Sequence, residues 1–150
     1  MKRHLHDVEA TNALAADLLV HLPQDVTGWT VLLEGDLGAG KSTFARALIT
    51  AMGHTGTVPS PTYTLVEPYQ LAGKIVYHVD LYRVSDEEEL RYLGWNELED
   101  GLRLVEWPDR APGLAAAADL QVRLDYAGLA RDAEISGLSS RGRVVVNAMD

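Results

Sequence analysis

Residues 35–42, with the sequence GDLGAGKS, are the part of the chain whose residue types and spacing most clearly predict chemistry. They fit the pattern of a glycine, four residues, and then Gly-Lys-Ser or Gly-Lys-Thr, in which the glycines let the backbone turn its N–H groups around an anion. An apolar stretch precedes the pattern and a helical stretch follows it, so the positive end of a helix would face the same anion. We therefore predict a loop that binds the phosphates of a nucleotide.

The side chains of this loop predict how phosphates and a metal ion would be held. Lys41 can reach the β- and γ-phosphates, and the hydroxyl of Ser42 is expected to be a ligand of a bridging Mg²⁺ ion. Thr43 could add a hydroxyl to the α-phosphate. The predicted nucleotide contacts of the loop are Asp36, Leu37, Gly38, Ala39, Gly40, Lys41, Ser42 and Thr43.

Two acidic residues stand where further ligands of Mg²⁺ would be needed. Asp80 ends the apolar run KIVYHVD, and Glu106 ends the run LRLVE. In a parallel sheet both carboxylates would emerge at the carboxyl edge, beside the phosphate loop. Asp80 is predicted to hold Mg²⁺ directly or through water, with the capping of the next turn as the alternative. Glu106 could orient water, hold Mg²⁺ through water, or pair with an arginine.

The elements that must position these residues alternate between helix and strand. Leucines spaced four apart predict the first helix, and a short apolar run predicts a strand buried on both faces just before the phosphate loop. Ser85 followed by Glu88 has the spacing of a capping box. The predicted helices are 8–22, 41–52 and 85–94, and the predicted strands are 29–34, 64–69, 74–81, 102–107, 119–126 and about 133–135, with a loop at 54–64.

The secondary structure of the tail is left open by the sequence, and one histidine is expected to have a structural role. The tail, residues 139–150, is undecided, because its three valines favour a strand while Ser139 or Ser140 could cap a helix. His78 lies inside a predicted strand and is expected to be a packed or hydrogen-bonded histidine rather than a catalytic one.

Composition limits the classes of protein that are possible. A chain of 150 residues, 47% of them hydrophobic, has the size and apolar mass of a single domain over residues 1–150. A formal net charge of −9 opposes direct binding of nucleic acid. There is no cysteine, no membrane-length apolar stretch and no convincing signal peptide, so we expect a cytoplasmic protein.

Five segments, in their order and spacing, give the chain a family resemblance. It resembles the TsaE (YjeE) family of bacterial P-loop ATPases over nearly its whole length. The implied fold is α/β, P-loop NTPase-like, with a mainly parallel sheet flanked by helices and antiparallel C-terminal strands, and the resemblance favours a helix for the tail. The segments that carry it are LLEGDLGAGKSTFARAL, SPTYTLVEPY, HVDLYR, EELRYLGWNEL and LVEWPDRA.

The resemblance also implies an activity and partners. Members of the family take part in making N6-threonylcarbamoyladenosine at position 37 of tRNAs that read codons beginning with A, by acting on the TsaB–TsaD heterodimer. The resemblance implies ATP and Mg²⁺ as cofactors, and contact with tRNA only through the partners. We expect the loop around Thr62, together with Tyr82 and Arg83, to take part in partner binding, although Arg83 could instead contact phosphate or form a surface salt bridge.

Individual positions match the family's motifs. Thr62 lies in PSPTYT, a segment compared to switch I of GTPases, and is predicted to be catalytic together with Asp80 and Glu106. Trp107 matches an element near the active site and is predicted to contact the nucleotide. The predicted metal ligands are Ser42, Asp80 and Glu106. The sequence departs from the family where many members have Thr in place of Ser42, which keeps the hydroxyl, and where Asp109 replaces a common Glu or Gln.

Two other functions of a phosphate-binding loop are alternatives to ATP hydrolysis. A P-loop kinase for a small molecule usually has a mobile lid that carries arginines, and residues 54–74 contain none. A guanine-nucleotide switch would need an Asn-Lys-x-Asp segment, which the chain lacks. An ATPase is therefore the favoured prediction, with the kinase as the alternative.

Overall fold

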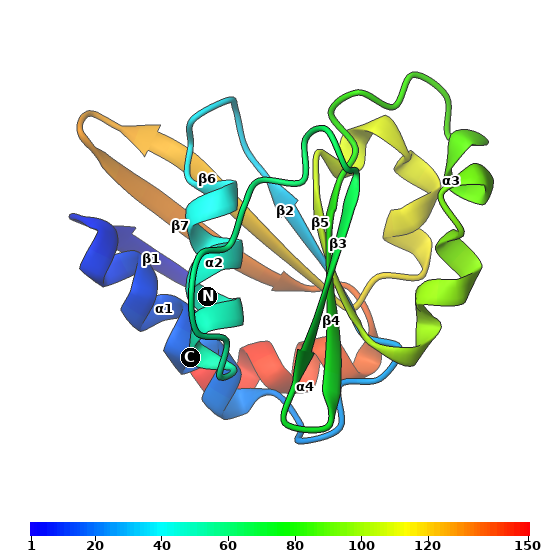
Figure 1. Cartoon of the computed structure of the whole chain (residues 1–150). Coiled ribbons are helices and arrows are strands. Elements are labelled where there is room, and N and C mark those ends of the chain that lie inside the picture. The colour runs from blue at the N-terminus through cyan, green and yellow to red at the C-terminus, as the bar shows by residue number, and fades with distance from the viewer.

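Seven strands form one mixed sheet in the structure, a computed structural model that describes residues 1–150 (Figure 1). Their order across the sheet is β1-β7-β6-β2-β5-β4-β3. The four central strands run parallel to one another, and antiparallel pairs flank them on both sides. The strands are β1 (Lys2–Leu5), β2 (Thr30–Glu34), β3 (Val66–Leu71), β4 (Lys74–Asp80), β5 (Leu102–Glu106), β6 (Leu120–Ala127) and β7 (Ala130–Gly137).

Helices cover both faces of the sheet, which confirms the predicted α/β class. Three longer helices pack on one face, whereas a short helix and 3₁₀ turns cover the other (Figure 1). The run at β2 is apolar throughout because Val31 and Leu33 join the core under the longer helices while Leu32 joins the smaller core on the opposite face. The helices are α1 (Val8–His21), α2 (Lys41–Ala51), α3 (Glu89–Tyr92) and α4 (Ser140–Met149), and the 3₁₀ segments are Trp95–Asp100, Pro108–Arg110 and Pro112–Ala116.

Two strands form the edges of the sheet. Strand β3 pairs only with β4 and carries Pro68, which has no backbone N–H to donate. Strand β1 at the other edge is four residues long, KRHL, and pairs only with β7. The sequence did not predict β1, because its mainly polar residues have neither an apolar run nor a clear alternation.

The helix predicted over residues 85–94 is shorter in the structure, and it does not begin with the predicted capping box. Only Glu89–Tyr92 is α-helical, and the Ser85 hydroxyl donates to the Glu89 carboxylate rather than forming a capping box with Glu88. The backbone N–H of Glu88 is taken by the side chain of Asp86, so the segment begins as a tight turn. Gly94, at φ 72°, then ends the short helix in the left-handed conformation.

The undecided tail is a helix, as the family resemblance implied. The hydroxyl of Ser139 caps α4 by accepting the N–H of Gly142 at 3.0 Å. Helix α4 packs against β7 and α1. The last predicted strand was too short, because β7 spans Ala130–Gly137 and pairs along its whole length with β6. No helix has the length and apolarity that a membrane crossing needs.

A buried carboxylate ties three of these elements together. Asp119, just before β6, is 3% exposed and accepts hydrogen bonds from the N–H of Thr30, the hydroxyl of Ser139 and the guanidinium of Arg141. Burial alone would raise the pKa of Asp119, but these hydrogen bonds, those of Arg141 and Ser139 foremost, hold it below its ordinary value. Asp119 thus fixes the start of β2 and the N-terminus of α4 against β6.

Asp119→Asn is expected to lower the free energy of unfolding at neutral pH by about 2–3 kcal/mol, because it removes the charged partner of Arg141 and leaves too few acceptors for the donors around it. Since the pKa of this carboxyl is lower in the folded state, its stabilisation is complete above its unfolded pKa of about 3.9 and is lost as the pH falls through the folded pKa. Urea unfolding at neutral and acidic pH tests this, and the difference between wild type and variant should shrink in acid. Asp125→Asn, in an exposed pair with Arg123, should change stability little.

Candidate active site

The phosphate loop follows β2 and ends at the first turn of α2. Gly35 packs so closely that a Cβ there would lie 2.5 Å from the carbonyl oxygen of Leu124, and Gly40, at φ 114°, begins the helix in a conformation that favours glycine. From Gly38 to Thr43, every backbone N–H group except that of Ala39 donates no hydrogen bond within the protein, which leaves five free donors: Gly38, Gly40, Lys41, Ser42 and Thr43. Such a row of free donors at a helix N-terminus is suited to an anion with several oxygens.

A cleft of about 340 Å³ lies over these donors. It brings together ten of the twelve residues predicted to be catalytic or to bind nucleotide or metal: Leu37, Gly38, Gly40, Lys41, Ser42, Thr43, Thr62, Asp80, Glu106 and Trp107. Asp36 and Ala39 do not line it. Ala39 is fully buried beneath the loop, and Asp36 lines a separate hollow with Asp109 and Arg123. Ser60 and Tyr82 complete the cleft; neither was predicted as a nucleotide, metal or catalytic residue, although Tyr82 was expected to take part in partner binding.

Lys41 rests on the carbonyl groups of its own loop. Its ammonium donates to the oxygens of Gly35 and Asp36 at 2.6 and 2.9 Å and lies 4.1 Å from the centre of the Trp107 ring. Burial lowers the pKa of Lys41, and the negative charges of Glu106 and Asp80 oppose that shift. The cleft therefore contains one cation together with two carboxylates.

Glu106 is held between a hydroxyl and a histidine. Both of its carboxylate oxygens accept from the hydroxyl of Ser42, at 2.9 and 3.0 Å, and Oε2 lies 2.6 Å from Nε2 of His78. His78 and Glu106 are 1% and 3% exposed. Glu106 has no arginine partner, so the alternative of an arginine pair is wrong. His78 is packed and hydrogen-bonded as expected, but its contact with Glu106 was not predicted.

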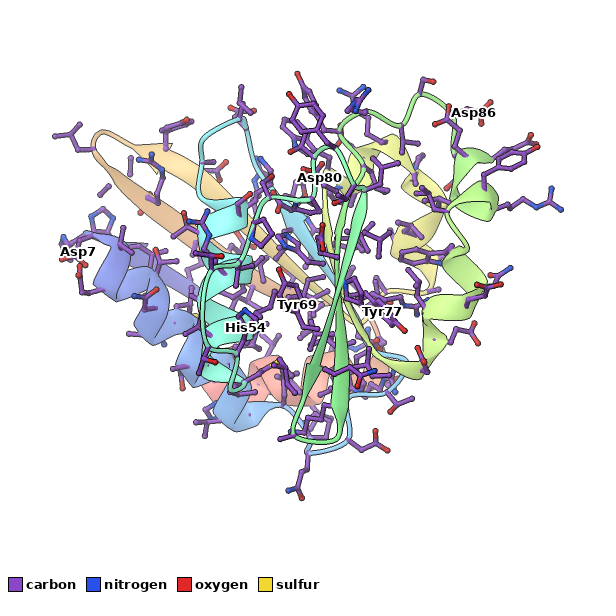
Figure 2. The ribbon with its side chains drawn as sticks, in the orientation of Figure 1. Asp7, His54, Tyr69, Tyr77, Asp80 and Asp86 are labelled. Carbon is purple, nitrogen blue, oxygen red and sulfur yellow. The ribbon has the colours of Figure 1, made fainter.

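Asp80 occupies the neighbouring strand end. Its Cα pairs in register with that of Glu106 across β4 and β5, and Figure 2 shows it at the end of the β3–β4 hairpin opposite the turn. One carboxylate oxygen accepts the N–H of Tyr82 at 2.9 Å, which is the turn-capping contact that had been an alternative. The other oxygen accepts the hydroxyl of Thr62 at 3.0 Å, and thereby ties the loop before β3 to the cleft.

Two aromatic side chains line the cleft. Trp107 adopts a left-handed backbone at φ 57°, uncommon outside glycine, as the chain turns from β5 into a 3₁₀ segment. Its ring lies 5.0 Å from that of Tyr82. Arg83 packs against Tyr63, with its guanidinium 5.4 Å from the ring, and does not line the cleft.

The side chains of the cleft suit Mg²⁺ better than a metal ion that takes three or more ligands from the protein. No group of three or more acidic or histidine side chains is placed to hold a metal ion. Mg²⁺ commonly keeps several waters and takes one or two carboxylates together with phosphate oxygens. Asp80 and Glu106 are the two carboxylates in the cleft, and Ser42 adds a hydroxyl at the first turn of α2.

A central parallel strand that leads into a glycine-rich loop and a helix N-terminus, with acidic residues at the ends of two neighbouring strands, defines a P-loop NTPase-like protein. A family model described as "Threonylcarbamoyl adenosine biosynthesis protein TsaE" matches residues 5–133 of the chain. The chain belongs to the TsaE family.

Proteins similar to this chain occur in several bacteria. The chain is 44% identical over 120 residues to the tRNA threonylcarbamoyladenosine biosynthesis protein TsaE of Haemophilus influenzae, covering 79% of this chain and 76% of the relative. It is 37% identical over 119 residues to the protein of the same name from Synechocystis, covering 76% and 74%. The crystal structure of YdiB from Bacillus subtilis matches with a TM-score of 0.76 at 26% identity, over 99% of this chain and 93% of YdiB.

Proposed function

We propose that the protein is a Mg²⁺-dependent ATPase that acts on the TsaB–TsaD heterodimer in the formation of N6-threonylcarbamoyladenosine at position 37 of tRNA, in the cytoplasm. The observation that carries the proposal is the cleft itself. It brings five free N–H groups and the Lys41 ammonium together with the carboxylates of Asp80 and Glu106. The family's place in threonylcarbamoyladenosine biosynthesis supports the choice of pathway.

The residues that would contact phosphate, metal and water have distinct roles in this proposal. The free N–H groups bind the phosphate oxygens, and Lys41 leaves the carbonyls of its loop to contact the β- and γ-phosphates. Ser42 and Asp80 would hold Mg²⁺, and the ion would supply positive charge to offset the negative charge of the phosphates. Once the Ser42 hydroxyl turns away, Glu106 is free to orient the attacking water or to hold a metal-bound water, while His78 keeps its carboxylate in place.

Partner binding is proposed to depend on the nucleotide. Thr62 reaches Asp80 from a loop whose exposed residues include Tyr63, 83% exposed, so a phosphate at the cleft can change what that loop presents. A switch of this kind needs ATP and ADP forms that bind the partner with different free energies. The net charge of −9 supports contact with tRNA only through the partners.

Phosphate release from Mg-ATP tests the proposal, with the purified chain alone and with TsaB and TsaD of the same organism. Slow hydrolysis that rises when the pair is added is the expected result, with Lys41→Ala as the blank. Rapid phosphate transfer to a small-molecule acceptor, without stimulation by the pair, would instead identify a kinase.

Tryptophan fluorescence should report the movement of Lys41. Because its ammonium lies over the Trp107 ring, Mg-ATP that draws Lys41 toward the phosphates is expected to change the emission of that indole. The change should persist in Trp29→Phe and Trp95→Phe and disappear in Trp107→Phe. A change in emission that remained in Trp107→Phe would come from another indole and would contradict the assignment of the signal to Lys41 and Trp107.

A further inference from the structure

The phosphate loop contacts a part of the chain that its sequence motif does not include. The β6–β7 hairpin extends beside the loop between β2 and α2 at the same end of the sheet (Figure 1). Tyr126 and Arg131 are directly opposite each other on the two strands of that hairpin. The Tyr126 hydroxyl donates to the carbonyl oxygen of Leu37 at 2.6 Å, and the Arg131 guanidinium donates to that of Gly38 at 3.2 Å.

These two contacts complete a pattern along the loop. The carbonyl groups of four consecutive residues, 35–38, all accept hydrogen bonds: the first two from Lys41, and the next two from Tyr126 and Arg131. In a planar peptide the C=O and the following N–H point in opposite directions. A donor that fixes the Leu37 carbonyl therefore also fixes the N–H of Gly38, which is one of the five free donors of the cleft.

The second peptide closes the turn of the loop. Arg131 holds the carbonyl of Gly38, and the N–H of the same peptide, from Ala39, donates back to the carbonyl of Asp36 at 3.0 Å. Both ends of this peptide are thus engaged. The shape of the loop is thus held by one hydrogen bond from the β6–β7 hairpin and one hydrogen bond within the loop itself.

The packing at Gly38 shows how closely the hairpin approaches. A Cβ at this position would lie 2.6 Å from the Tyr126 hydroxyl, so a side chain here would displace it. The Arg131 guanidinium lies 4.3 Å from the Tyr126 ring and also donates to the carbonyl of Ala130, which orients both side chains toward the loop.

The two sets of contacts differ in what nucleotide binding does to them. Lys41 must leave the carbonyls of Gly35 and Asp36 in order to reach phosphate. Its hydrogen bonds to the loop are therefore lost when the nucleotide binds. Tyr126 and Arg131 belong to another element and do not line the cleft, so they can keep their contacts.

We propose that Tyr126 and Arg131 are positioning residues that hold the phosphate loop in its anion-binding shape from outside the nucleotide site. This inference rests on the proposed binding of Mg-ATP at that loop. Neither side chain touches the nucleotide; each acts through a carbonyl group of the loop. Their loss should therefore weaken the binding of ATP and ADP alike, and raise KM more than it changes kcat.

The test is calorimetric titration of Mg-ATP and Mg-ADP into wild type, Tyr126→Phe and Arg131→Met, with steady-state kinetics and melting temperatures without nucleotide. Tyr126→Phe removes one hydroxyl from a half-exposed ring and should leave the melting temperature near that of wild type. Its Kd for both nucleotides should rise roughly three- to tenfold, the effect of one lost hydrogen bond. Tyr92→Phe and Arg91→Met, exposed on α3 away from the loop, are the matched controls and should bind as wild type does.

The outcomes separate this inference from the function on which it rests. If wild type binds neither nucleotide, the proposed function fails and the inference falls with it. If wild type and controls bind while Tyr126→Phe and Arg131→Met bind equally well, only the inference is overturned. A lower melting temperature with unchanged Kd values would assign both residues to the stability of the hairpin, which also overturns it.

Discussion

Lys41→Ala is expected to weaken the binding of Mg-ATP by at least about 100-fold. The ammonium is the cation that the phosphate loop contributes to the cleft, and charge-assisted hydrogen bonds to phosphate are worth roughly 1.5–3 kcal/mol each. Two such bonds to the β- and γ-phosphates correspond to this loss or more. Isothermal titration calorimetry measures it directly.

The control must separate lost phosphate contacts from a damaged loop. In wild type the Lys41 ammonium also bonds the carbonyls of Gly35 and Asp36, so the variant should be compared with wild type for its melting temperature without nucleotide. Lys2→Ala removes an equal charge from the exposed edge strand β1 and should leave the Kd unchanged. A Kd for Lys41→Ala within about threefold of wild type would contradict the assignment of this loop as the phosphate site.

Asp80→Asn is expected to slow ATP hydrolysis by about 100-fold or more while the Kd for ATP changes by less than about fivefold. The amide keeps an oxygen that can accept the N–H of Tyr82, so the local turn should survive, but the negative charge that would hold Mg²⁺ is lost. Single-turnover phosphate release and calorimetry with the same samples measure the two effects separately.

Asp86→Asn is a matched control for this substitution. Asp86 also accepts the N–H of the residue two positions ahead, at 3.0 Å, but it stands near α3 and away from the cleft (Figure 2). Its variant should hydrolyse ATP at the wild-type rate. Equal losses of binding and hydrolysis in Asp80→Asn would show that Asp80 serves the nucleotide site as a whole, and not hydrolysis in particular.

The sequence predicted those parts of the fold that local patterns specify. Helices α1 and α2 have apolar residues at helical spacing and residues that end a helix, and the central strands have continuous apolar runs. Both kinds of element can therefore be predicted from short stretches of sequence. Strand β1 has no such pattern and exists because it pairs with β7, more than 120 residues later in the chain. Helix α3 was overestimated because side-chain hydrogen bonds of Ser85 and Asp86 compete with a regular helix start.

The same distinction holds for the candidate site. The phosphate loop is a contiguous motif, and Asp80 and Glu106 could be found because each ends an apolar run. The contact of His78 with Glu106 depends on the pairing of β4 with β5, which the sequence does not specify. Tyr126 and Arg131 could not be found either, since the only hint was a strand-turn-strand pattern far from the loop.

The two edges of the sheet have a consequence for how copies of the chain meet in solution. Proline at position 68 interrupts the row of backbone donors along β3, and the other edge is short and carries Lys2 and Arg3. Sheets that add strands edge to edge need a long, uninterrupted and uncharged row of donors and acceptors. Neither edge offers one, so the protein should resist aggregation through strand addition even at the concentrations that calorimetry requires.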